Sequence, residues 1–214
     1  MDLKELLALS PRLNVDGDGN AVSYRLGKSV LQYLDGILGS SQSTLETGTG
    51  VSTVLFAMKR TKHTCITTNR LEVDGTAGFC KEHEIPLDKV RFIIGRSEYV
   101  LPSLESSGLD VVLIDGRHAF PTPFIDWFYT ADKLRVGGLL IVDDVEMWTG
   151  RTLMDFLSKE PEWRRERFFM PNSVVFKKLA GGSNDKVWAK QPYLRRFSLF
   201  RTAANVKKRL LKRP

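Results

Sequence analysis

The sequence predicts a doubly wound α/β fold on a mostly parallel, seven-stranded sheet that ends in an antiparallel hairpin. From residue 40 onward, strand-like and helix-like segments alternate along the chain. The two strongest strand candidates, Val111–Ile114 and Leu139–Val142, are continuous apolar runs, which is typical of strands that are buried on both faces. Past Glu160 the alternation gives way to two adjacent strands joined by a turn. A chain of 214 residues, 42% of them hydrophobic, suits one domain with a full core.

The first 39 residues are expected to form helices ahead of the sheet. Two amphipathic stretches, Leu3–Leu9 and Tyr24–Leu38, carry apolar residues at helical spacing. Between them, Asn14–Asn20 is a loop by composition. It resembles a calcium-binding loop but lacks the closing glutamate, so we expect no metal there.

Residues 40–180 are expected to form the α/β domain, with helical material between the strands at sites that include Thr53–Lys59 and Phe124–Leu134. The strands before the hairpin are expected at Thr44–Glu46, Thr64–Thr67, Val90–Ile94, Asp110–Ile114 and Leu139–Val142. The hairpin is expected to pair Arg167–Met170 with Ser173–Lys178 around Pro171 and Asn172.

Residues 181–214 are expected to form a basic tail. The chain has a net charge of +7, but eight basic and no acidic residues lie between Gln191 and Pro214, so the first 190 residues carry a charge of −1. This distribution argues against the whole protein being a nucleic-acid binder. Two isolated cysteines, a charged amino-terminal stretch and the lack of a long apolar run favour a cytoplasmic protein.

A glycine-rich segment, Glu46-Thr47-Gly48-Thr49-Gly50-Val51-Ser52-Thr53, lies between a predicted strand and a predicted helix. In open parallel sheets, ligands bind beyond the carboxyl ends of the strands, where glycines allow a tight turn and close approach of a ligand. The helix that follows offers free amide groups to a polar group. A pair of glycines can also mark no more than a turn, and this spacing fits neither the dinucleotide fingerprint nor the phosphate-binding loop.

Three aspartates and one histidine follow the two apolar strands. Asp115, Asp143 and Asp144 stand at neighbouring strand ends, and three carboxylates converging there suit Mg²⁺. The alternative is that Asp143 and Asp144 only cap a helix or face solvent. His118, three residues beyond Asp115, can serve as a general base if it overhangs the same pocket, or it is an ordinary surface or packing residue, as we expect of His63 and His83.

Together these segments resemble the class I methyltransferases that use S-adenosylmethionine, over roughly residues 40 to 180. Glu46-x-Gly48-x-Gly50 with Ser52-Thr53 looks like the first motif of that family, in which the glycine loop approaches the methionine part of the cofactor. The segments Val112–His118 and Leu134–Asp144, with Asp126 between them, are similar to a metal-dependent subgroup that methylates hydroxyls of small molecules or sugars.

The resemblance implies a set of site residues. The cofactor would be held by Glu46, Gly48, Thr49, Gly50, Ser52, Thr53, Asn69, Ser97 and Asp115, the metal by Asp115, Asp143 and Asp144, and His118 would act as the base. Two positions depart from the family. Asn69 stands in place of the usual acid that holds the ribose, since Glu72 lies further along, and Arg96 replaces the usual acid in Gly95-Arg96-Ser97.

We therefore expect Mg²⁺-assisted O-methylation of a small-molecule or sugar hydroxyl. The alternatives are a cofactor-binding scaffold without catalysis and a nucleic-acid methyltransferase, although the Asn-Pro-Pro-Tyr motif of many amino-methylating enzymes is missing. Met147 and Trp148 would either form a wall over the acceptor or pack in the core. The identity of the acceptor and the oligomeric state, a homo-oligomer included, stay open.

The tail offers a further partner. From Leu194 to Leu211, apolar residues are interleaved with arginines and lysines. Such a segment suits an anionic membrane surface, which would make the protein peripheral to a membrane. The alternatives are that the tail docks on its own domain or on a second subunit, or that it is disordered.

Overall fold

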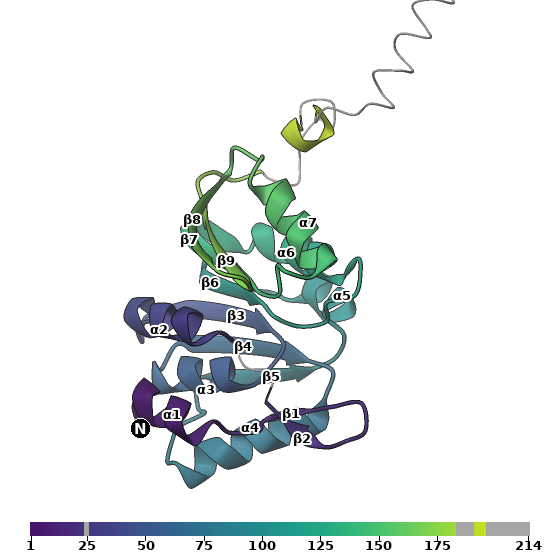
Figure 1. Cartoon of the computed structure of the whole chain (residues 1–214). Helices are drawn as coiled ribbons and strands as arrows, with labels where there is room; N and C mark the ends of the chain where they lie inside the picture. Colours follow the sequence, from purple (N-terminus) through teal and green to yellow (C-terminus); the bar gives the residue numbers. More distant parts are fainter. Residues whose placement is uncertain (24–25, 183–190, 196–214) are drawn as a thin grey trace, which may run out of the picture.

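The structure is a computed structural model that describes residues 1–23, 26–182 and 191–195. Its centre is a seven-stranded sheet (Figure 1), which confirms the expected architecture. In spatial order the strands are β5 (Val90–Ile94), β4 (Lys62–Thr67), β3 (Ser43–Thr47), β6 (Leu109–Ile114), β7 (Leu134–Val142), β9 (Ser173–Lys178) and β8 (Trp163–Phe169).

Strand direction matches the predicted mostly parallel pattern. Strands β3 to β7 pair in parallel, and β9 pairs antiparallel with both β7 and β8. The strand order reverses where β3 meets β6, and a crevice beyond the carboxyl ends of these two strands is the usual ligand site of such sheets.

Helices cover both faces of the sheet because alternate strand residues point to opposite sides. Val111 and Leu113 pack in one core cluster, and Val112 and Ile114 pack in the other. The Val111 side carries α1 (Leu3–Leu9), α2 (Lys28–Ile37), α3 (Val51–Met58) and α4 (Arg70–Glu82). The Val112 side carries α5 (Ser97–Val100), η1 (Leu101–Ser103), α6 (Thr122–Ala131) and α7 (Trp148–Leu157).

The amino-terminal segment differs from the prediction in two places. The expected loop at 14–20 begins with a short strand, β1 (Asn14–Val15), which pairs with β2 (Ala21–Val22) into an antiparallel hairpin. The helix expected from Tyr24 begins only at Lys28, after Gly27, because a glycine there favours a helix start over a helix interior. In Figure 1 the hairpin lies beside α4, near the carboxyl ends of the strands.

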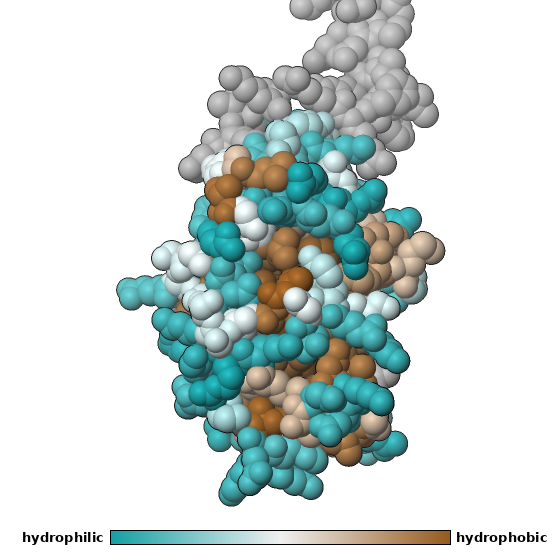
Figure 2. Space-filling view, turned by 90° about the vertical axis from the view of Figure 1, so that its left-hand side faces the viewer, coloured by the Kyte–Doolittle hydropathy of each residue, from teal (hydrophilic) through white to brown (hydrophobic). Residues whose placement is uncertain are grey.

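The opposite end of the sheet faces the viewer in Figure 2. Apolar residues on this face form separate patches, divided by bands of hydrophilic residues. A shallow polar cavity of about 1120 Å³ lies at the amino ends of the strands, lined in part by Lys62, Lys89 and Arg91. Within the described residues, no helix is long and apolar enough to cross a membrane.

Most of the predicted tail lies outside the described residues. The part that is described includes a short 3-10 helix, η3 (Pro192–Arg195). The Tyr193 ring packs edge-on against Phe156 of α7, with the ring centroids 5.5 Å apart. Tyr193 therefore contacts the core beside α7.

Candidate functional site

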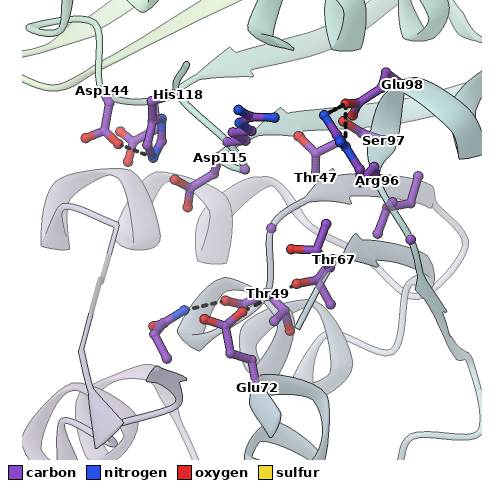
Figure 3. Close-up of a pocket in the computed structure, with 18 of the residues that line it drawn as sticks. Thr47, Thr49, Thr67, Glu72, Arg96, Ser97, Glu98, Asp115, His118 and Asp144 are labelled. Atoms are coloured by element: carbon purple, nitrogen blue, oxygen red, sulfur yellow. Dashed lines mark hydrogen bonds and ion pairs between the residues drawn. The ribbon is translucent and has the colours of Figure 1, made fainter. Parts of the chain in front are cut away.

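A cavity of about 950 Å³ opens at the carboxyl ends of the central strands (Figure 3). Residues that follow β3, β4, β5, β6 and β7 line it, together with Asn14 and Ser23 from the amino-terminal hairpin region. Seven of the predicted site residues lie on its wall: Gly48, Thr49, Ser97, Asp115, His118, Asp143 and Asp144. The fold thus brings the glycine loop and the acidic strand ends to one site.

The loop after β3 closes against the loop after β6. Gly48 has φ +102°, and a Cβ there would stand 2.2 Å from the carbonyl oxygen of Asp115, far inside van der Waals contact. Gly116 is also tight, since its Cβ would lie 3.3 Å from the Gly48 amide nitrogen. Only glycine at position 48 lets the two loops approach this closely.

Four other predicted cofactor residues lie behind this loop and do not line the cavity. Glu46 is buried, and its carboxylate accepts hydrogen bonds from the hydroxyls of Ser52, at 2.7 Å, and Thr53. Thr53 Oγ1 in turn accepts the backbone amide of Gly50 at 3.0 Å. Their observed contacts hold the start of α3 in place, and a direct role toward the cofactor stays a prediction.

The amino-terminal hairpin forms one wall of the cavity, which the sequence did not indicate. Asn14 donates from Nδ2 to the carbonyl oxygen of Thr49 over 2.8 Å, and the Val15 amide donates to Glu72 over 3.2 Å. Both bonds span large separations along the chain, so no local pattern could reveal them.

A carboxylate does stand near the end of β4, although the expected position holds none. Asn69 caps α4, where its side chain accepts the amide of Leu71 at 3.0 Å, and it is absent from the cavity wall. Glu72 lies in the first turn of the helix, where its side chain lies over Thr67 and lines the cavity. The acid that seemed too far along the chain thus faces the cavity (Figure 3).

The end of β5 carries a charge pair. Arg96 bonds Glu98 from Nε over 2.7 Å and lies over the Tyr99 ring, and both Arg96 and Glu98 line the cavity. The backbone amide of Glu98 lowers the pKa of its carboxyl, and Arg96 lowers it further. The base that replaces the family's acid therefore comes with an acid two residues later.

The acidic strand ends converge on the other side of the cavity. Burial, followed by the charges of Asp143 and Asp144, raises the pKa of Asp115 well above its ordinary value. Burial likewise raises the pKa of Asp143 to about 6, opposed by a hydrogen bond that its Oδ1 accepts from Ser173. Carboxylates this crowded and desolvated favour either a shared proton or a bound cation.

His118 is paired with Asp144 at the same end, as Figure 3 shows. Its Nε2 lies 2.9 Å from Oδ2 of Asp144, and this hydrogen bond raises the pKa of His118 above its ordinary value. Asp144 has φ 50°, a left-handed conformation that is uncommon for aspartate and turns the chain sharply after β7. Asp115, His118 and Asp144 each offer one ligand atom within 4.8 Å of the others, so the group includes His118 where the sequence suggested Asp143.

Apolar side chains edge this end of the cavity. Met147 lines it, and the neighbouring Trp148 is 69% exposed, with its ring centroid 6.0 Å from that of Phe120. The exposure of Trp148 and Phe120 argues for a surface role over packing in the core.

Comparison with known proteins bears on this site. Residues 45–145 match a family described as a methyltransferase domain, a range that contains the glycine loop and the three aspartates. No curated protein matches the sequence.

Solved structures share the fold at low sequence identity. The cofactor-bound Rv0187 from MTB is 16% identical, with a TM-score of 0.66 over 84% of this chain and 90% of that one. The O-methyltransferase TomG from Streptomyces achromogenes, involved in tomaymycin synthesis and solved with S-adenosylmethionine, is 16% identical, with a TM-score of 0.63 over 82% and 90%. An rRNA methylase from Streptococcus thermophilus is 13% identical, with a TM-score of 0.58 over 72% and 96%. At these identities the likeness shows the fold alone.

Proposed function

We propose that the chain, whose residues 45–145 match a methyltransferase domain, is a class I S-adenosylmethionine-dependent methyltransferase that transfers the methyl group to a hydroxyl of a small molecule or sugar. One observation carries this proposal: the His118–Asp144 pair stands at one end of a cavity that also contains the glycine loop. A proton acceptor beside the place where the methyl group is presented is what O-methylation requires.

The residues present fit the cofactor. The cavity of about 950 Å³ is at the upper end of the usual size for ligand sites, so it has room for a cofactor and an acceptor. Gly48 leaves a cradle that a Cβ would fill, and Glu72 places a carboxylate where ribose hydroxyls can donate to it. When bound, the cofactor supplies an electrophilic methyl group on a sulfonium, which is already a good leaving group.

His118 is the proposed base. Neutral imidazole can take the hydroxyl proton as the acceptor oxygen attacks, and Asp144 stabilises the imidazolium that results. Much of the rate would come from alignment of the acceptor oxygen with the methyl group. Met147 lines the cavity, and the exposed rings of Trp148 and Phe120 offer an apolar surface nearby that would hold the acceptor close to His118.

A divalent cation fits the same end of the site. Asp115 and Asp144 provide hard oxygen ligands, and Asp143 adds negative charge next to them, which leaves the nitrogen of His118 that is not paired with Asp144 for its role as base. The raised pKa values of Asp115 and Asp143 show how costly it is to keep these acids charged without a counter-ion. Mg²⁺ bound there would acidify and orient the acceptor hydroxyl.

Calorimetric titration with S-adenosylhomocysteine, with and without Mg²⁺, tests the proposal. We expect binding in both conditions, together with Mg²⁺ binding that Asp144→Ala removes. A chain that binds S-adenosylhomocysteine in neither condition is not the proposed enzyme. If S-adenosylhomocysteine binds but Mg²⁺ does not, the proposed role of the metal is wrong, and the His118–Asp144 pair must activate the acceptor without it.

The scaffold alternative is tested by the same variant. A protein that only binds cofactor should keep its biological role in Asp144→Ala, whereas the enzyme should lose it. The nucleic-acid alternative predicts binding to RNA or DNA that falls steeply as salt rises, which filter binding across a salt series detects.

A further inference from the structure

We propose that His63 is a positioning residue for the cofactor, acting through Glu46 and Thr49 from the inside of the sheet. This inference rests on the proposed cofactor role of the glycine loop. It gives a function to a histidine whose sequence context indicates none.

A chain of buried polar side chains runs from His63 in both directions. Its Nε2 lies 3.1 Å from Oε1 of Glu46, and its Nδ1 lies 2.8 Å from Oγ1 of Thr44. Thr44 Oγ1 is 3.1 Å from Thr61 Oγ1, and the Thr61 hydroxyl donates to the carbonyl oxygen of Phe56. The side chains of all four polar residues are buried, so water cannot replace a missing partner.

Counting protons fixes the direction of each bond, because a hydroxyl has only one to donate. Since Thr61 gives its proton to Phe56, the bond between the threonines needs the proton of Thr44. Thr44 must then accept from His63 Nδ1–H. The bond between His63 and Glu46 therefore holds a further proton, and the two residues together form a pair of zero net charge.

This pair explains how a carboxylate can lie buried behind the glycine loop. A lone buried charge is costly, and a neutral, hydrogen-bonded pair avoids most of that cost. The Phe56 ring stacks on the His63 ring with centroids 4.3 Å apart and so covers one face of the imidazole.

The same counting of protons applies to the hydroxyl groups between Glu46 and the cavity. Because the proton between His63 and Glu46 is supplied from the His63 side, Glu46 accepts hydrogen bonds from Ser52 and Thr53. The Thr53 hydroxyl therefore has no proton left for other partners. Thr53 Oγ1 then accepts the Thr49 hydroxyl at 3.1 Å. Thr49 lines the cavity, and its oxygen is left with lone pairs as an acceptor.

An acceptor at this position suits the ammonium group on the amino-acid part of the cofactor. Without His63, zero net charge is kept at this buried position only if the Glu46 carboxyl group carries the proton itself, and it would then donate that proton to Ser52 or Thr53. If Thr53 accepts from Glu46 instead of donating to it, Thr53 donates its hydroxyl proton to Thr49. The hydroxyl proton of Thr49 then faces the cavity. The site would thereby lose affinity for a cation while keeping its shape.

Two ligands separate this effect from a loss of fold. S-adenosylhomocysteine carries the amino-acid part, whereas methylthioadenosine contains the adenosine portion without it. We expect His63→Leu to raise the Kd of S-adenosylhomocysteine about tenfold or more, as loss of one charge-assisted bond does, and to leave the Kd of methylthioadenosine within about twofold. His83→Leu is the matched control, because the His83 ring also lies beside a phenylalanine ring, that of Phe79, with centroids 4.3 Å apart. This control should change the Kd of neither ligand.

The outcomes are distinct. Wild type that fails to bind S-adenosylhomocysteine overturns the proposed function itself. Wild type that binds, with His63→Leu binding both ligands as well as wild type or losing both equally, overturns the role of His63. If His63→Leu does not fold, Thr44→Val removes the acceptor of the Nδ1 proton with little change of shape; it should weaken S-adenosylhomocysteine selectively, and no change there overturns the proposal.

Discussion

Gly48 and Asp115 are in direct backbone contact across the gap between β3 and β6, so that a Cβ on Gly48 would stand 2.2 Å from the Asp115 carbonyl oxygen. The loop that shapes the proposed cofactor site and the loop that carries the first acid of the proposed catalytic end are therefore one packed unit. A change in either loop moves the other.

Gly48→Ala should consequently abolish cofactor binding. Besides the clash, alanine at φ +102° is strained, and together these effects are expected to cost on the order of 1–3 kcal/mol or more. We expect no measurable binding of S-adenosylhomocysteine by calorimetry, with a lower melting temperature. Gly17→Ala is the control, since nothing lies within 4 Å of a Cβ there. Wild-type affinity in Gly48→Ala would show that the two loops can separate without loss of the site.

His118→Gln should separate catalysis from binding. Loss of a general base typically lowers the rate by 10²- to 10⁴-fold, while the glycine loop is left intact. We expect kcat to fall by about that amount once an acceptor is known, and the Kd of S-adenosylhomocysteine to stay near the wild-type value. A variant that keeps full kcat would remove His118 from the mechanism.

Asp126→Asn should stabilise the protein in a pH-dependent way. Neither carboxylate oxygen of Asp126 makes a well-formed hydrogen bond among the described residues. Burial raises the pKa of Asp126 to about 6, and the nearby hydroxyls of Ser97 and Thr47 oppose this rise only in part. The folded protein therefore binds this proton more tightly than the unfolded chain, whose aspartate titrates near 3.8. The loss of unfolding free energy caused by ionising the buried Asp126 is absent below pH 3.8, grows as the pH rises to about 6 and is complete above that pH.

Relative to wild type, Asp126→Asn should gain up to about 3 kcal/mol of unfolding free energy at pH 7 and close to nothing near pH 3.5. Urea unfolding at several pH values measures this difference. A gain that does not depend on pH would mean that the effect comes from shape and not from ionisation.

Truncation after Arg195 tests the membrane role proposed for the tail. This variant keeps Tyr193, which packs on Phe156, and removes seven of the eight basic residues of the tail. If the tail binds anionic lipid, with each basic residue contributing about 1 kcal/mol, sedimentation with anionic liposomes at low salt should be lost. Binding of S-adenosylhomocysteine should be unchanged. A change in oligomeric mass would instead assign the tail to the fold of the protein.

Much of the sheet could be predicted because strands buried on both faces leave a strong local signal. Strands β6 and β7 read as unbroken apolar runs, and the turn at Pro171-Asn172 marks the hairpin. Helix α4 received no bounds from the sequence, since only Val73, Thr76 and Cys80 are buried along its 13 residues. Helix α7 was also not predicted, although Leu153 and Leu157 are fully buried against the core.

Some residues of the candidate site could likewise be predicted from the sequence, and others could not. Gly48, Asp115 and Asp144 follow strands directly, so their place at the carboxyl edge could be inferred from topology alone. Asn14 reaches the cavity through a contact with the distant Thr49, for which the sequence gives no signal, whereas Glu72 faces it because the start of α4 brings the side chain over Thr67.

The position of β9 between β7 and β8 also fixes an order of assembly. During synthesis from the amino terminus, β3 to β7 leave the ribosome first and can pair in parallel, whereas the sheet cannot close until residue 178 has emerged. Ser173, the hydrogen-bond partner of Asp143, belongs to that last strand. A nascent chain can therefore build the glycine loop early, but its acidic end is completed only when β9 has been inserted.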